Sequence, residues 1–282
     1  MKLVSKPVEK VWGRTALPFA CADAGDALVG ELWFNHPGGA ASPLLVKFIF
    51  TAAPLSVQVH PDDRQARERG LPHGKSECWY IVDAEPGAAV ALGLTDALSR
   101  DQLRAAALDG TIARRLAWRP VCAGDFFYIP AGTIHAIGGG VSLIEVQQPS
   151  DVTYRLFDHG RARELHIEEA VAVARREPYP DRFATPTTGD GVQVLVSSPH
   201  FTLVRVAPGA EPPSRLEGRD RWVVPLDAAV CSRADEAALG ECLFVPAGEP
   251  LTLAPGASCL IAVEGAVQAD RLSEPARLRK VA

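Results

Sequence analysis

Short runs of β-branched and aromatic residues recur along the whole chain and constrain its fold more than any other feature. Glycine and proline, which number 24 and 23, separate these runs. Three examples are LLVKFIF at 44–50, FFYIP at 126–130 and CLIAVEG at 259–265. Many short strands with frequent turn signals are typical of a sandwich or a barrel. The sequence therefore predicts a mainly β protein.

Two segments depart from this pattern and predict short helices. Residues 95–117 (TDALSRDQLRAAALDGTIARRLA) place apolar side chains at helical spacing, with Asp109-Gly110 as a break. Residues 166–177 (HIEEAVAVARRE) form a second amphipathic segment, which Pro178 and Pro180 are expected to stop.

An internal repeat indicates two similar β units. GDFFYIPAGTIHAI begins at Gly124 and GECLFVPAGEPLTL begins at Gly240, an offset of 116 (240 − 124). A Pro-Ala-Gly triplet alone recurs readily by chance, but the matched glycine-acid spacing before it favours duplication. His135 falls opposite Leu251, so any chemistry that uses this histidine belongs to the N-terminal unit.

The boundary between the two units is expected in a proline-rich segment. Residues 177–191 (EPYPDRFATPTTGDG) have the composition of a linker. We therefore predict an N-terminal catalytic domain at 1–180 and a C-terminal domain without metal ligands at 181–282.

Four residues in the N-terminal unit form a candidate metal-binding set: Gln58, His60, Glu77 and His135. Gln58 and His60 are two apart in a β-branched run, a spacing that points both side chains to one face of a strand. Imidazole, carboxylate and amide groups can together hold zinc and leave a position open for substrate. The alternatives are a turn cap for His60 and a core histidine bonded to the backbone for His135. Glu77 would be costly to bury without a partner.

The overall composition excludes several other classes of protein. The net charge is −5 and the pI about 5.8, which disfavours a nucleic-acid-binding surface. No apolar stretch approaches the roughly 20 residues of a membrane helix. The six cysteines form no CxxC pair, and the first residues, MKLVSKPVEKVWGR, lack the apolar region of a signal peptide. We therefore expect a cytoplasmic protein with reduced thiols.

Five blocks in order resemble the type I phosphomannose isomerases, especially the shorter bacterial members. These blocks are KPVEKVWGR (6–14), PLLVKFIFTAAPLSVQVHPDD (43–63), GKSECWY (74–80), IPAGTIHAI (129–137) and IEVQQPSDVTYRLFDHGR (144–161). The resemblance implies two cupin domains, each a jelly roll or double-stranded β-helix, with a few short helices. It also implies one Zn²⁺ per chain, although other divalent metals could occupy such a site, held by Gln58, His60, Glu77 and His135.

The resemblance also assigns roles to charged residues in apolar strands. Lys75 and Arg155 match catalytic positions, whereas Lys47, Ser56 and Glu145 are expected to bind substrate. Taken alone, a charge in an apolar strand more often faces solvent or an ion partner than a pocket. The general base remains open between Lys75, Glu145 and a water on the metal.

The activity that the resemblance implies is the interconversion of mannose 6-phosphate and fructose 6-phosphate. The alternatives are an isomerase of another sugar or sugar phosphate, a non-catalytic sugar-sensing cupin, and an iron oxygenase. Arg14 stands where the family more often has glycine, so it could line the entrance and alter substrate preference. We expect a small sugar phosphate as the partner, no nucleic acid or membrane, and a monomer or homodimer.

Overall fold

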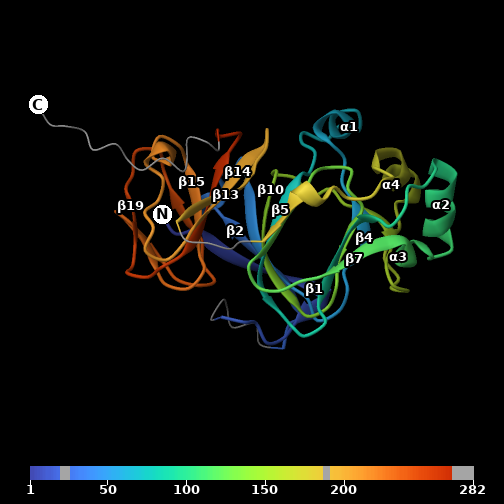
Figure 1. Ribbon diagram of the computed structural model, residues 1–282, viewed down its shortest axis with the longest axis horizontal. Helices are drawn as coiled ribbons and strands as arrows, with labels where there is room; N and C mark the ends of the chain where they lie inside the picture. Colours follow the sequence, from blue (N-terminus) through green and yellow to red (C-terminus); the bar gives the residue numbers. More distant parts are fainter. Residues whose placement is uncertain (20–25, 187–190, 269–282) are drawn as a thin grey trace, which may run out of the picture.

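The computed structural model describes residues 1–19, 26–186 and 191–268, and it is built mainly of antiparallel β-sheets (Figure 1). Cys21, residues 187–190 of the predicted linker and residues 269–282 of the second predicted domain lie outside the described residues.

Strands account for most of the described elements. Their bounds are β1 Val4–Arg14, β2 Val29–Asn35, β3 Leu45–Phe50, β4 Val57–Val59, β5 Glu77–Ala84, β6 Ala89–Leu94, β7 Leu116–Pro120, β8 Asp125–Ile129, β9 His135–Ile137, β10 Val141–Gln147, β11 Tyr154–Phe157, β12 Ala184–Pro186, β13 Val192–Ser197, β14 Phe201–Val206, β15 Arg221–Pro225, β16 Val230–Ser232, β17 Glu236–Ala237, β18 Leu243–Val245, β19 Leu251–Leu253 and β20 Cys259–Glu264. Short 3-10 turns lie at η1 Pro37–Gly39, η2 Asp181–Phe183 and η3 Ser214–Leu216.

The strands form two barrel-like halves, each made of two facing sheets. In the N-terminal half a seven-stranded sheet, β1-β2-β3-β10-β5-β8-β12, faces a five-stranded sheet, β11-β4-β9-β6-β7. In the C-terminal half a five-stranded sheet, β13-β14-β20-β15-β18, is accompanied by the smaller sheet β17-β16-β19. This arrangement confirms the predicted mainly β fold of cupin type.

The two halves repeat one topology, which confirms the duplication inferred from the sequence. The order β3-β10-β5-β8 in the first half recurs as β14-β20-β15-β18 in the second. Strand β9 at 135–137 and strand β19 at 251–253 are separated by the same 116 residues as the sequence motifs (251 − 135). Gly132 (φ 87°) and Gly248 (φ 81°) end the two Pro-Ala-Gly turns in the left-handed region, which explains the glycine in both copies.

The central strands of the seven-stranded sheet are buried on both faces, and the side chains of β10 alternate between the two faces. Ile144 and Val146 point into a core that they share with Phe201, Leu203 and other residues of the C-terminal sheet. Leu143 instead packs inside the N-terminal barrel, on the face that also carries Glu145. One strand thus joins the two halves through one face and supplies polar groups to the barrel interior through the other.

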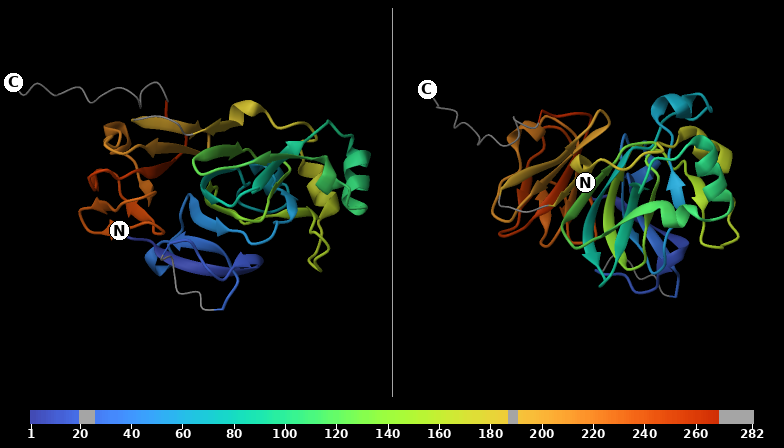
Figure 2. Two further views of the ribbon diagram at one scale, coloured as in Figure 1. Left: turned by 60° about the horizontal axis from the view of Figure 1, so that its bottom comes forward. Right: turned by 45° about the vertical axis from the view of Figure 1, so that its right-hand side comes forward.

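The start of the chain crosses from one half to the other. Figure 2 shows the N-terminus beside the C-terminal half, although β1 belongs to the N-terminal sheet. The Leu3 amide donates to the Cys242 carbonyl (2.9 Å), and the terminal amine donates to the Phe244 carbonyl (2.7 Å). These contacts link the two halves in addition to their shared core.

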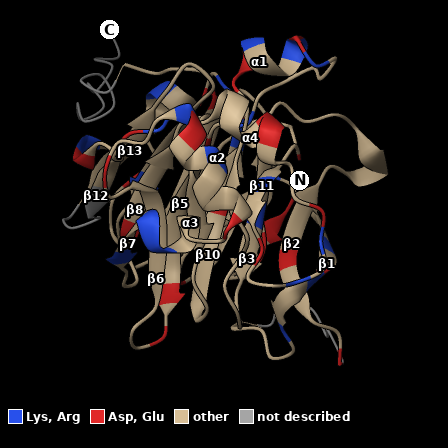
Figure 3. Ribbon diagram, turned by 90° about the vertical axis from the view of Figure 1, so that its right-hand side faces the viewer, with Lys and Arg blue, Asp and Glu red and all other residues tan. Residues whose placement is uncertain are grey.

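The helices are few and short: α1 Asp63–Arg67, α2 Arg100–Leu108, α3 Ile112–Arg115 and α4 Ile167–Val173. Helices α2 and α4 cover the outer face of the sheet that contains β4 and β9 (Figure 3), where Leu103 and Val171 pack against Val57 and Val59. Among the described residues no helix has the length and apolar character to cross a membrane.

The predicted break between α2 and α3 is confirmed, because Asp109 ends α2 and Gly110 has a φ of 76°. The predicted extent of the second helix to residue 177 is wrong, because α4 ends at Val173. Beyond it the backbone pairs with other segments: the Arg175 amide donates to Gly132, and the Leu98 amide donates to Arg176. These tertiary hydrogen bonds end the helix before Pro178 is reached.

Candidate metal centre and adjoining pocket

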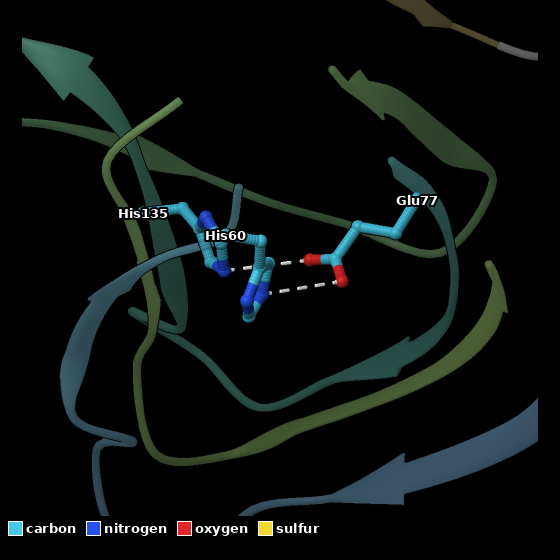
Figure 4. A group of neighbouring side chains, drawn as sticks. All are labelled: His60, Glu77 and His135. Carbon is cyan, nitrogen blue, oxygen red and sulfur yellow. Dashed lines mark ion pairs between the residues drawn. The ribbon is translucent and has the colours of Figure 1, made fainter. Parts of the chain in front are cut away.

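Three of the four predicted metal ligands meet inside the N-terminal barrel. His60 directly follows β4, His135 begins β9 in the same sheet, and Glu77 begins β5 in the opposite sheet. Figure 4 shows both imidazoles turned toward the Glu77 carboxylate. The His60 Nε2 atom lies 3.5 Å from Glu77 Oε2, and the His135 Nε2 atom lies 3.4 Å from Glu77 Oε1. The candidate ligand atoms all lie within 4.8 Å of one another.

Backbone carbonyls orient the two histidines. His60 Nδ1 donates to the Val152 carbonyl (2.7 Å), and His135 Nδ1 donates to the Thr133 carbonyl (2.9 Å). Each ring therefore directs the lone pair of Nε2 toward the cluster, as metal-ligating histidines do. Burial lowers the pKa of His135 to about 4, and burial with the nearby Lys75 places the pKa of His60 well below its usual value. Both imidazoles are thus neutral near pH 7, the state that binds a metal.

The Glu77 carboxylate supplies the test of whether a cation fits here. It is fully buried, and within the described part of the chain neither of its oxygens accepts a hydrogen bond from a neutral donor. Its ion partner is Lys75, whose Nζ lies 3.1 Å from Oε2. Burial, together with the charge of Glu145, raises the pKa of Glu77 to about 7. A buried carboxylate with so few partners beside two neutral imidazoles is a donor set that fits a divalent metal.

Gln58, the fourth predicted ligand, lies at the edge of this cluster. It is the strand partner of His135, and its Nε2 is 3.2 Å from the Nε2 of that histidine. Its Oε1 accepts a hydrogen bond from the Ser56 hydroxyl (3.2 Å). The amide thus touches the cluster through its nitrogen, and a half-turn of the carboxamide would present the oxygen instead.

A polar pocket of about 170 Å³ adjoins the cluster. All the other predicted site residues line this pocket: Lys47, Ser56, Lys75, Glu145 and Arg155. Gln58 lines it as well. Lys75 connects the pocket with the cluster, since its Nζ lies 3.3 Å from His60 Nε2.

A ladder of alternating charges forms one wall of the pocket. Lys47 Nζ lies 2.9 Å from Glu145 and 3.7 Å from Glu31, and Lys10 lies 3.2 Å from the other oxygen of Glu31. Trp79 Nε1 donates to the second oxygen of Glu145 (2.7 Å). Burial raises the pKa of Glu145, but the charges of Lys47 and Lys75 outweigh this effect and hold the pKa at about 2. Glu145 is therefore an ionised, weakly basic carboxylate, which suits binding better than proton abstraction.

Several residues that line the pocket were not predicted from the sequence. Lys10 and Glu31 are charge partners from neighbouring strands, a relationship that appears only once β1 and β2 are paired. Arg163 lies two residues beyond the last resembling block and was available as a signal. His166, which directly precedes the short α4 helix, also lines the pocket.

Arg14 does not line the pocket, contrary to expectation. Its Nε donates to the Thr51 carbonyl (3.0 Å), and its guanidinium pairs with Glu85 (3.0 Å). At this position the arginine therefore makes contacts with Thr51 and Glu85 outside the pocket.

The fold and site together define a two-barrel cupin with one polar site in its N-terminal barrel. Mannose-6-phosphate isomerase ManA of Bacillus subtilis is 36% identical over 225 residues, which cover 64% of this chain and 70% of that protein. The chain therefore belongs to the mannose-6-phosphate isomerase family.

Two further comparisons agree with this assignment. A mannose-6-phosphate isomerase of Streptococcus mutans is 42% identical over 182 residues, which cover 61% of this chain but only 57% of that protein. The crystal structure of the mannose 6-phosphate isomerase from Bacillus subtilis superposes with a TM-score of 0.75 at 26% identity, covering 93% of this chain and 98% of that one. No protein-family model matches the chain.

Proposed function

We propose that this chain is a metal-dependent aldose–ketose isomerase that interconverts mannose 6-phosphate and fructose 6-phosphate. The observation that carries the proposal is the buried His60–Glu77–His135 cluster beside a pocket lined by lysine, arginine and carboxylate groups. The names of the two relatives support the substrate.

Zinc is the metal we propose, with one ion per chain. Two neutral imidazoles and one carboxylate are a zinc donor set that leaves a position open, and Gln58 is placed to add an amide oxygen. When bound, the ion would polarise the sugar carbonyl as a Lewis acid.

The residues of the chain would perform the remaining steps. Moving a proton between C2 and C1 of an open-chain sugar builds negative charge on O1 and O2, and the cationic guanidinium of Arg155 can stabilise it. Arg155 is suited to this because, among the described residues, its Nε has no hydrogen-bond partner. We assign proton transfer to Lys75 Nζ, since Glu145 is too weak a base at a pKa of about 2.

Lys47, Ser56 and Glu145 would bind the sugar. The first and last form an ion pair that fixes both side chains in the wall, whereas the Ser56 hydroxyl lies next to Gln58. Such a wall offers donors and acceptors in fixed positions, which suits several hydroxyl groups held at once.

The remaining proposals concern the whole protein. We propose two domains, and the pairing of β12 with β8 favours a boundary after Pro186 rather than at 180. We also propose a monomer or homodimer in the cytoplasm. The described cysteines, all free thiols, support that compartment.

A coupled assay on the purified protein tests the activity. It would follow conversion of mannose 6-phosphate to fructose 6-phosphate before chelation, after chelation and after zinc is returned. We expect turnover that chelation abolishes and zinc restores. An absence of turnover with zinc fully bound would refute the substrate assignment and lead to a panel of free sugars and other sugar phosphates.

A further inference from the structure

The three residues before β5 carry Lys75, and side chains from elsewhere in the chain hold them in place. The Gly74 amide donates to Asp63 Oδ1 (2.8 Å), and the Ser76 amide donates to Gln148 Oε1 (2.9 Å). Between them, the Lys75 amide donates to the Pro61 carbonyl (3.0 Å). All three consecutive amides are therefore bonded outside a regular sheet.

The two side chains that hold this segment are also bonded to each other. Gln148 Nε2 donates to Asp63 Oδ1 (2.9 Å), so one carboxylate oxygen accepts from both Gly74 and Gln148. The backbone amide of Gln148 also donates to the Ser76 carbonyl (3.1 Å). Asp63, Gln148 and the backbone of 74–76 thus form one closed hydrogen-bonded unit.

This segment lies tightly against the turn that follows His60. A Cβ atom at Gly74 would lie 2.5 Å from the Asp62 carbonyl carbon, so no side chain fits there. Because Pro61 directly follows His60, the bond from Lys75 to Pro61 sets the lysine backbone relative to that histidine. The result is a Lys75 Nζ that lies 3.3 Å from His60 Nε2 and 3.1 Å from Glu77 Oε2.

We propose that Asp63 and Gln148 are positioning residues that act through Lys75, by fixing the backbone at 74–76 so that the lysine reaches both the metal cluster and the pocket. The catalytic part of this inference rests on the proposed isomerase function. Neither Asp63 nor Gln148 lines the pocket that holds Lys75, so their effect on turnover is indirect.

The second oxygen of Asp63 faces a different part of the protein from the first. The hydrogen bonds accepted by Oδ1 can therefore be tested separately from the charge near Oδ2. Oδ2 lies 3.8 Å from Nδ1 of His200 in the C-terminal half. Asp63, Gln148 and His200 line a cleft of about 730 Å³ between the two halves. An asparagine at position 63 keeps an oxygen for Gly74 and Gln148 but removes the charge that faces His200.

The test is an exchange of the two hydrogen-bonding groups. Gln148→Glu sets two carboxylates against each other across a 2.9 Å contact and should displace the segment. Asp63→Ala removes both bonds to Oδ1. In the double variant Asp63→Asn with Gln148→Glu, the introduced carboxylate can accept from both the Ser76 amide and the introduced carboxamide. The contact between positions 63 and 148 is thus restored, whereas the Gly74 amide loses its acceptor. Asp109→Ala is the matched control, since Asp109 also accepts from a backbone amide, that of Thr111, in a distant turn.

The first readout does not depend on turnover. Lys75 is buried, so acetic anhydride should label it slowly in the natural chain, as measured by peptide mass spectrometry. We expect about tenfold faster labelling in Asp63→Ala and Gln148→Glu, and a return toward the original rate in the double variant, because local opening exposes the segment. Unchanged labelling in both single variants would overturn the proposal even if the protein proved to have a different substrate.

The second readout is kinetic. With zinc content unchanged, we expect kcat to fall about 10- to 100-fold in Asp63→Ala and Gln148→Glu with little change in KM, since a 1 Å misplacement can cost about 100-fold. In a Lys75→Ala background the same changes should have no further effect on kcat. Full additivity with Lys75→Ala, or a double variant no better than Gln148→Glu, would contradict action through Lys75.

Discussion

Arg221 occupies in the C-terminal barrel the position that Glu77 occupies in the N-terminal barrel. Each begins its strand, and their strand partners Ile129 and Val245 are 116 residues apart, the offset of the repeat (245 − 129). At the same offset His135 is replaced by Leu251. The second barrel has thus exchanged a candidate metal-binding carboxylate for a buried guanidinium, which donates to the carbonyls of Pro246 and Glu249.

Arg221→Met should therefore affect stability and not the metal site. Methionine can fill much of the same volume, but it removes the guanidinium donor of the Pro246 and Glu249 carbonyls; the Pro246 carbonyl keeps the Glu249 amide (3.1 Å) as a donor. We expect a loss of about 1–3 kcal/mol in the free energy of unfolding, the range for losing hydrogen bonds from a charged group. Urea denaturation measures the loss, while zinc content and kcat should stay at the level of the natural chain. A fall in zinc content would mean that the change reaches the metal site through the core that the two barrels share.

The sequence predicted the repeated elements because their signals are local. The turn glycines and the Pro-Ala-Gly motif indicate where β8 ends and β9 follows. The spacing of Gln58 and His60 indicates that both side chains lie on one face of a strand. The ladder of alternating charges in the pocket wall could not be predicted from local signals. Lys10, Glu31 and Lys47 come from three strands whose pairing is set by tertiary packing, and no local pattern records that register. Likewise, the early end of α4 depends on backbone bonds to distant segments.

Two buried carboxylates on neighbouring strands should respond differently to the same substitution. Glu77→Gln removes the charge that faces both imidazoles, so zinc content should fall by at least about tenfold, the lower range for a weakened metal site. Glu145→Gln keeps an oxygen for Trp79 and leaves the cluster intact, so zinc should be retained while turnover falls. Elemental analysis after gel filtration gives the metal content of both variants. Equal retention of zinc by both variants would show that Glu77 is not a ligand.

Lys47→Met should be one of the most destabilising changes in the barrel. Lys47 is the buried cation between Glu31 and Glu145, and its removal leaves two buried carboxylates with reduced compensation. Breaking such a network costs about 3–5 kcal/mol. Lys10→Met is the matched control, because Lys10 is more exposed and pairs only with Glu31 among its described ion partners; its loss should cost less than about 1 kcal/mol.

The effect of Lys47→Met should also depend on pH. Against the effect of burial, Lys47 and Lys75 together lower the pKa of Glu145 to about 2. This carboxylate therefore stabilises the natural fold above its usual pKa, and that contribution is lost as the pH falls toward 2. The difference in unfolding free energy between the natural chain and the variant should therefore shrink in acid. A difference that stays constant down to about pH 3 would mean that the lost packing of the lysine stem, rather than charge, accounts for it.

Zinc uptake by the metal-free protein should release a proton in a defined pH range. Burial and Glu145 raise the pKa of Glu77 to about 7, whereas burial lowers the pKa of His135 to about 4. Between these values the imidazoles are neutral and Glu77 carries a proton that zinc must displace. We therefore expect release of about one proton per zinc near pH 6, little release above about pH 8, and an apparent zinc affinity that rises about tenfold per pH unit up to about 7.

Calorimetry in two buffers of different ionisation enthalpy measures this proton release directly. The Glu77→Gln variant is the control, because its amide carries no displaceable proton, and whatever zinc it still binds should release almost none near pH 6. Release of two or more protons by the natural chain at that pH would show that the imidazoles are protonated before binding. In that case burial would not suffice to keep both rings neutral against the carbonyls of Val152 and Thr133, whose hydrogen bonds raise the pKa values of His60 and His135.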